Sequence, residues 1–266
     1  MCESPRPVVV PALLFAALGL FAQAPAQRPT FDAFDVATIK PTPADWRGGR
    51  YIRMPSPRRF VATNYTLRVL LGAAYNLTPR AILGGPAWLD SDHYDVIAAT
   101  PGEIRPNLDE QMAMLRKLLG DRFMLRFHRE EKEFSVYALS VAKGGLKLKE
   151  STASPDEDPV IVSQLYPGGV LLPARNATMA QFATVMQRSI FDRPVLDKTG
   201  LSGRYDFDLE WTPDETQFDG QRQETKESAK PGLFAAIQQQ LGLRLESTKG
   251  IVQALAIDRI ERPSEN

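Results

Sequence analysis

The stretch Asn176–Trp211 reads NATMAQFATVMQRSIFDRPVLDKTGLSGRYDFDLEW. It decides the fold because its pattern occurs a second time, about 112 residues earlier in the chain. Thr178 precedes apolar residues at the spacing of one helix face, and Thr66 precedes an apolar set with the same spacing. A strand pattern begins at Tyr205 and has a counterpart that begins at Tyr94. We therefore expect a helix followed by a strand in each copy.

Further elements flank the helix and strand of each copy. Extended segments around a proline-rich or glycine-rich turn, at residues 50–63 and 160–173, predict a hairpin before each helix. A second helix in each copy ends at Gly120 or Gly242. The segments Phe123–Ala142 and Leu243–Ile260 then predict terminal hairpins, with turns near Glu130–Glu133 and at Lys249–Gly250.

The predicted fold is α+β, with two similar halves. Each half has two helices packed on small mixed sheets and a terminal β-hairpin, in the order hairpin, helix, strand, strand, helix, hairpin. The strand from Tyr205 alternates apolar and charged residues, so one face is expected to be buried. The continuous apolar run at residues 96–99 predicts a strand covered on both faces.

The chain divides into segments of different composition. Residues 1–26 contain Arg6, an apolar run and small residues at a cleavage spacing, which together indicate a cleaved signal peptide; an uncleaved anchor is the alternative. Residues 27–150 form the first half, the acidic stretch 151–159 a linker and residues 160–266 the second half. The polar insertion 212–231 is expected to be mobile.

Composition limits the function classes. The chain has 266 residues, 43% of them hydrophobic, and a formal net charge of 0, so no basic surplus favours nucleic acid as a partner. Cys2 is the only cysteine and leaves with the signal. We expect a secreted protein, periplasmic or extracellular, with no stable membrane insertion after cleavage.

Few residues suggest chemistry. Asp197–Gly200 reads DKTG, as in the phosphorylation site of P-type ion pumps, but Leu201 replaces the expected threonine and a turn is the better interpretation. His93 lies near Asp92 and Asp95, and these residue types leave a secreted hydrolase as an alternative.

Metal and cofactor sites are not indicated. The chain has two histidines, and the carboxylates of Asp206, Asp208 and Glu210 are about 7 Å apart along one strand face, too far apart to bind one cation. We expect no catalytic, cofactor-binding or metal-binding residues and no cofactor. Gly85, Trp88, His93 and Tyr94 are the candidates for a ligand groove.

The runs Ile82–Leu89 and Arg193–Leu201, with Tyr94–Val96 and Gly203–Phe207, resemble the signatures of an uncharacterised family of secreted proteins from soil bacteria, especially acidobacteria, named domain of unknown function 3738. The resemblance covers nearly the whole mature chain. Some relatives look like the extracytoplasmic part of membrane sensor peptidases. The halves also resemble the short N-terminal domain of secretins and TonB-dependent transducers, which are docking modules without catalytic residues.

The combined expectation is a secreted, non-enzymatic binding or docking module for a protein, peptide or envelope component. Its binding surface is expected at an exposed strand edge or in the groove between the halves. The alternatives are the hydrolase based on His93 and a structural module of an envelope assembly.

Overall fold

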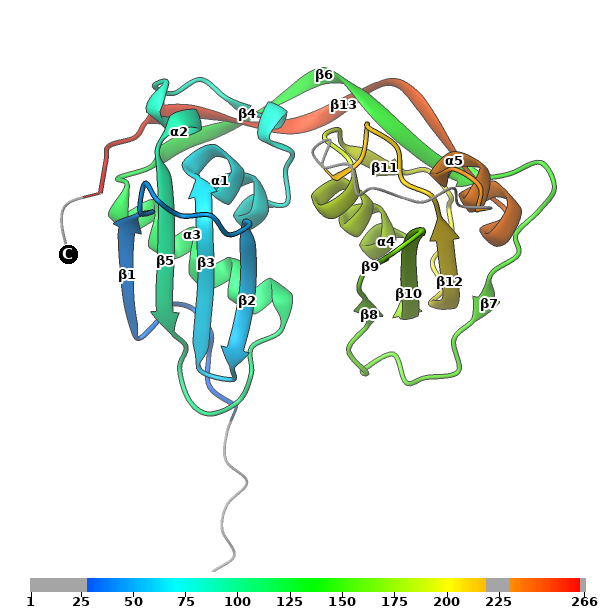
Figure 1. The fold of residues 1–266 in the computed structure, drawn as a ribbon, viewed down its shortest axis with the longest axis horizontal. Coiled ribbons are helices and arrows are strands. Elements are labelled where there is room, and N and C mark those ends of the chain that lie inside the picture. The colour runs from blue at the N-terminus through cyan, green and yellow to red at the C-terminus, as the bar shows by residue number, and fades with distance from the viewer. Residues whose placement is uncertain (1–27, 219–229, 264–266) are drawn as a thin grey trace, which may run out of the picture.

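The computed structural model describes residues 28–218 and 230–263, which form an α+β fold with two lobes (Figure 1). The first lobe is built on an antiparallel sheet with the strand order β1-β5-β3-β2. Its strands are β1 (Val36–Pro41), β2 (Tyr51–Ser56), β3 (Arg59–Thr66) and β5 (His93–Ala99). The α+β prediction is confirmed.

The second lobe is built on a sheet with the order β7-β12-β10-β8, in which β9 also pairs with β10. Its strands are β7 (Lys149–Glu150), β8 (Val160–Ile161), β9 (Gln164–Tyr166), β10 (Gly169–Ala177) and β12 (Tyr205–Trp211). One edge strand of each sheet, β2 in the first and β8 in the second, thus comes from the hairpin predicted before the first helix of that half.

A third sheet, with the order β11-β6-β13-β4, joins the lobes. The long strands β6 (Arg126–Val141) and β13 (Leu243–Arg259) pair antiparallel along their length and arch across both lobes (Figure 1). The short strands β4 (Ile82–Leu83) and β11 (Val195–Asp197) add in parallel to β13 and β6.

The two predicted terminal hairpins are therefore wrong. Neither Phe123–Ala142 nor Leu243–Ile260 turns back on itself, because each forms one strand that pairs with the other. Gly250, which suggested a turn, lies opposite Phe134 in the ladder. A Cβ atom at Gly250 would be 2.8 Å from Cδ1 of Leu196, so the glycine makes room for packing instead of a turn.

Helices cover the inner faces of the two sheets. The first lobe has α1 (Leu67–Tyr75), η1 (Pro79–Ala81), α2 (Trp88–Ser91) and α3 (Leu108–Arg122). The second has α4 (Met179–Val185), continued by the π-helix η2 (Met186–Ile190), and α5 (Leu233–Ala236), continued by the π-helix η4 (Ile237–Leu241).

The predicted helix ends are mostly confirmed. Thr178 and Gln181 form the capping box that begins α4, and Thr66 is the N-cap of α1 without a side-chain bond. Gly242 ends η4 with a left-handed φ of 67°. The prediction for Gly120 is wrong, because α3 continues past it to Arg122.

Each lobe has its own hydrophobic core, and each core takes residues from the long strands. Leu255 of β13 is buried in the first core, whereas Leu139 of β6 and Leu245 of β13 are buried in the second. The predicted boundary at residue 150 thus lies well beyond the point at which the chain enters the second core. The similarity of the two halves stays a prediction.

The central strands of the two lobes have the same alternating burial. In β12, Phe207 and Leu209 are buried, as predicted, whereas Asp208 is exposed. The prediction that residues 96–99 are covered on both faces is wrong, because Ile97 of β5 is 44% exposed. Helices cover only one face of this sheet, so the opposite face is left to solvent.

The linker and the insertion both contact the second lobe. The side-chain amide of Asn176 donates to the carbonyl oxygens of Ser154 and Glu157, each at 2.8 Å. The backbone N–H of Thr212 donates to the carbonyl of Pro231 at 3.0 Å, so the described ends of the insertion 212–231 are held together. The predicted signal peptide, residues 1–26, lies outside the described residues, as do residues 219–229 in the middle of this insertion.

Candidate functional site

A cavity of about 550 Å³ lies between the two lobes. One wall comes from β2, α1 and the segment leading into η1, and the other from β8, α4 and η2. We call this cavity the interlobe groove. The residues on which its chemistry depends are Arg50, Ile52, Thr78, Leu108, Val162 and Arg188.

Two sheet edges border the interlobe groove. β2 is the last strand of the first sheet and β8 the last of the second, and Figure 1 shows these edges on facing sides of the lobes. Edge strands carry backbone N–H and C=O groups that the sheet itself does not pair. The edge of β2 is partly covered, because Arg105 donates to the carbonyl of Met54 at 3.2 Å. The β8–β9 edge is therefore the more open of the two.

Exposed apolar side chains gather along the β8–β9 edge. Val160, Val162 and Leu165 are all exposed, with Val162 at 56%, and Leu108 of α3 is 50% exposed at the opposite wall. Val162 and Ser163 connect β8 and β9 outside the ladder with β10, and both line the groove. An apolar, unpaired strand edge of this kind is typical of a site for strand addition.

Contacts between the lobes support the groove. Asn76, the C-cap of α1, accepts a hydrogen bond from Nε2 of Gln187 at 2.9 Å and donates from Nδ2 to Oγ1 of Thr184 at 3.3 Å. Arg80 and Asp192 form an ion pair of 2.7 Å across the same interface. These contacts join α1 and η1 to α4 and η2 across the interface.

The interlobe groove has a positive charge balance. Its charged lining residues are three arginines, Arg50, Arg80 and Arg188, and one aspartate, Asp192. Burial of the Arg188 guanidinium is the main cause that lowers the pKa of this residue from its ordinary value. Because Asp192 already pairs with Arg80, an anionic group in the groove has cationic neighbours that this aspartate does not neutralise.

The four residues predicted as a ligand groove, Gly85, Trp88, His93 and Tyr94, do not line the interlobe groove. Trp88 stacks on Phe123 with ring centroids 6.3 Å apart, and Tyr94 packs edge-on against the same ring at 5.4 Å. Burial raises the pKa of Tyr94 above its ordinary value. Gly85 has a φ of 80° in an exposed turn. A ligand-binding role for these residues stays a prediction.

The histidine of the hydrolase hypothesis is exposed and stands apart from its carboxylates. Nδ1 of His93 lies 3.3 Å from the carbonyl oxygen of Asn64, which is the contact recorded for this ring. Asp95 accepts from Thr42 at 2.7 Å, and Asp92 accepts from Arg262 at 3.0 Å. The structure therefore does not bring His93 and either carboxylate into a hydrogen bond within the described chain, and the hydrolase stays a hypothesis.

The DKTG motif forms a turn, as the sequence predicted. Oδ1 of Asp197 accepts from the backbone N–H of Thr199 at 2.9 Å and from its hydroxyl at 2.7 Å. Gly200 follows with a left-handed φ of 69°. The carboxylate is thus used in a local turn at the end of β11.

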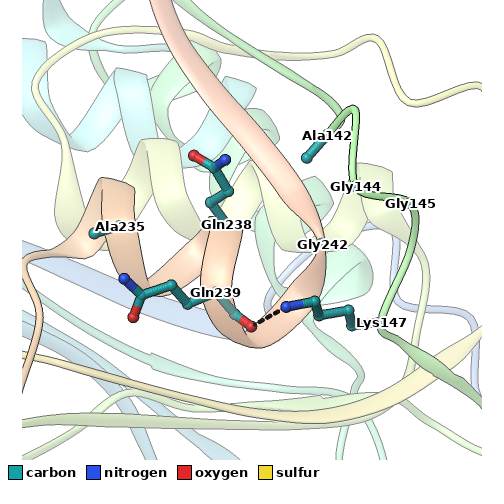
Figure 2. A pocket seen from close by; sticks show the side chains of 8 residues that line it. All are labelled: Ala142, Gly144, Gly145, Lys147, Ala235, Gln238, Gln239 and Gly242. Atoms are coloured by element: carbon teal, nitrogen blue, oxygen red, sulfur yellow. Dashed lines mark hydrogen bonds between the residues drawn. The ribbon is translucent and has the colours of Figure 1, made fainter.

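A second cavity, of about 320 Å³, lies where the turn after β6 meets the end of η4 (Figure 2). Figure 2 shows its single charged side chain, Lys147, whose amine donates to the carbonyl of Gln239 at 2.9 Å. The backbone N–H of Ala142 donates to Gly242 at 2.9 Å. These bonds tie the turn to the helix end, so we read this cavity as part of the scaffold.

The comparison with protein families agrees with the resemblance to domain of unknown function 3738. No curated protein and no solved structure matches this chain. No helix among the described residues is long and apolar enough to cross a membrane. A family described as "Protein of unknown function (DUF3738)" matches residues 68–260, which include α1 from its second residue onward, both groove-forming helices of the second lobe and both long strands. The chain therefore belongs to the DUF3738 family of proteins of unknown function.

Proposed function

We propose that this chain is a secreted, non-enzymatic binding protein that takes up an extended peptide segment in the interlobe groove. The observation that carries the proposal is the meeting of an open, apolar strand edge with a cavity of about 550 Å³. A protein or envelope component would be recognised through such a segment. Export, to the periplasm or outside the cell, is supported by the apolar run before residue 27.

Binding by strand addition does not need a cluster of polar side chains. A peptide that extends the second sheet beyond β8 and β9 would use backbone hydrogen bonds for affinity. Its side chains would alternate between the two sides of the sheet, so that every second one faces the groove. Val162 and Leu108 would give these side chains apolar contacts from opposite walls.

The test is a selection of displayed peptides against the purified protein, residues 27–266. The display library consists of random eight-residue peptides fused through their C-termini to the carrier. We expect peptides to be enriched on the wild type and to lose binding to Val162→Asp, because the aspartate replaces an apolar contact of the added strand with a hydrated charge. Backbone N-methylation of a selected peptide at alternate residues should also abolish binding, since it removes the donors of the ladder.

The matched control is Val36→Asp. Val36 is 67% exposed on β1, the opposite edge of the first sheet, so this variant makes the same chemical change away from the groove. The selected peptides should bind it as they bind the wild type. Failure to enrich any peptide, or equal binding to both aspartate variants, would contradict the proposed function.

A further inference from the structure

Arg188 is a half-buried cation in the groove that forms no direct ion pair with a carboxylate among the described residues. Burial lowers its pKa, and the charge of Asp109 lies near enough to act against this lowering. Its recorded hydrogen bond runs from the guanidinium to Sδ of Met112 at 3.6 Å, and a thioether is a weak acceptor. Taking a guanidinium out of water without an anionic partner is unfavourable. The other arginines of the groove differ, because Arg80 pairs with Asp192 and Arg50 lies over the ring of Tyr65 at 5.3 Å.

Thr78 is a second polar group of the groove wall with an unmet hydrogen bond. It is only 2% exposed, and its hydroxyl has no hydrogen-bond partner in the part of the chain that the structure describes. The N-cap position of Thr78 before η1 does not use the side chain either. Buried hydroxyls normally have a partner, so Oγ1 of Thr78 adds an unmet polar group to this wall of the groove.

We propose that the interlobe groove selects peptides with an acidic side chain, whose carboxylate pairs with the guanidinium of Arg188. This inference rests on the proposed function and names the chemistry of the segment bound. A carboxylate can accept two parallel N–H bonds from a guanidinium, and such a pair is stronger where water is excluded. The charge balance of the lining, with three arginines against one aspartate, favours the same ligand.

An acidic side chain fits the geometry better than the carboxylate at a peptide's C-terminus. Arg188 lies on η2, whereas the open edge lies on β8 and β9. A peptide main chain added to that edge is occupied by ladder hydrogen bonds, and its alternate side chains are the groups that reach away from the edge. The groove therefore recognises Asp or Glu within an extended, otherwise apolar sequence.

The experiment repeats the peptide selection on the wild type and on Arg188→Met. Methionine keeps an unbranched chain and removes the charge. We expect Asp or Glu at one fixed position of the peptides enriched on the wild type, and no such preference on Arg188→Met. Replacing that residue by Asn or Gln in a synthetic, C-terminally amidated peptide should weaken binding to the wild type about tenfold and leave binding to Arg188→Met unchanged.

Three controls separate recognition from folding. Arg188→Met should unfold at the same or a higher temperature than the wild type, because it replaces a poorly paired, half-buried charge. Arg244→Met removes an exposed arginine on β13 that pairs with Glu246, and it should keep the acidic preference. Arg188→Lys retains a positive charge and should retain part of that preference.

The possible outcomes distinguish the two proposals. Peptides enriched without an acidic position, or with the same acidic position on Arg188→Met, overturn the inference and leave the proposed function standing. A second library displays random peptides with free C-termini. If peptides are enriched from this library alone, the groove captures a terminal carboxylate and the inference is overturned. Absence of any enriched peptide overturns the proposed function, and the inference with it.

Discussion

The backbone N–H of Asn176 donates a hydrogen bond of 2.8 Å to Oδ1 of Asp206, and this bond closes the irregular end of β10 before α4. Asn176 has a left-handed φ of 52°, which places its N–H outside the regular ladder. The first lobe has the same arrangement, in which Asn64 donates to Asp95 at 2.9 Å with a φ of 61°. Each lobe thus uses an aspartate of its central strand to satisfy a bulged residue before a helix.

The Asn176 bond predicts a pH dependence of stability. The backbone hydrogen bond from Asn176 is the largest cause that holds the pKa of Asp206 below its ordinary value. A carboxyl group whose pKa is lowered by folding stabilises the fold at pH values above its pKa in the unfolded chain, which is about 4. This contribution is lost as the pH falls through the lower pKa of the folded protein. Asp206→Asn should therefore be less stable than the wild type at pH 7, with the gap closing at pH 3. Urea unfolding at pH 7 and pH 3 measures the difference in free energy of unfolding between the two proteins. A difference of equal size at both pH values would contradict the prediction.

Gly242 is predicted to tolerate no side chain. It combines a φ of 67° with a position where an added Cβ would lie 2.1 Å from the carbonyl oxygen of Gly145. Gly242→Ala should lower the free energy of unfolding by about 1–3 kcal/mol. The control is Gly120→Ala inside α3, where no heavy atom lies within 4 Å of the new Cβ. This variant should be up to about 1 kcal/mol more stable in the same urea titration. Equal effects of the two substitutions would refute the explanation.

Gln217 is predicted to stabilise the start of the insertion through one buried hydrogen bond. Its Oε1 accepts from Nε1 of Trp211 at 2.7 Å, and both residues are buried. Gln217→Leu leaves the indole N–H unpaired and should cost about 1–3 kcal/mol. Gln253→Leu, at an exposed position of β13, should change stability by no more than about 0.5 kcal/mol. Thermal unfolding of both variants checks the difference.

The elements were predictable from the sequence where local chemistry decides them. The Thr178 capping box, the turn after Asp197 and the alternation in β12 depend on residues close together in the chain, and each is confirmed. The pairing of β6 with β13 was not predictable, because a strand has the same alternation whichever strand it joins. The turn predicted at Gly250 was wrong because glycine occurs both in turns and at positions where a neighbouring side chain needs room.

The position of the groove could be predicted from the sequence, but the residues that line it could not. The groove between the halves was one of the two places expected for a binding surface, beside an exposed strand edge. Arg188, however, lies on an ordinary amphipathic helix pattern, and nothing near it in the sequence shows that its guanidinium bonds to Sδ of Met112 instead of forming a direct ion pair. Val162 offered only a weak indication of an exposed apolar site. It is apolar, but the pattern of the segment around it does not assign it to the core. The roles proposed for Arg188 and Val162 depend on which walls face each other, and the long strands set how the two lobes lie.

Each lobe uses a long strand from the other half of the chain. We therefore expect that residues 27–150 do not fold alone. Residues 27–150 contain β4 but lack β13, so Ile82 loses its ladder partner Leu255, and the first core loses the Leu255 side chain. Within the same fragment, Leu139 of β6 would expose a side chain that the second core normally buries.

The fragment 27–150 should therefore show no cooperative urea transition by circular dichroism, whereas co-expression with residues 151–266 should restore one. In the intact chain, Leu255→Ala and Leu139→Ala should each cost about 2–5 kcal/mol. Ile251→Ala, at a site 58% exposed in the middle of β13, should cost far less. A cooperative transition of the isolated fragment would mean that the first core is complete without β13.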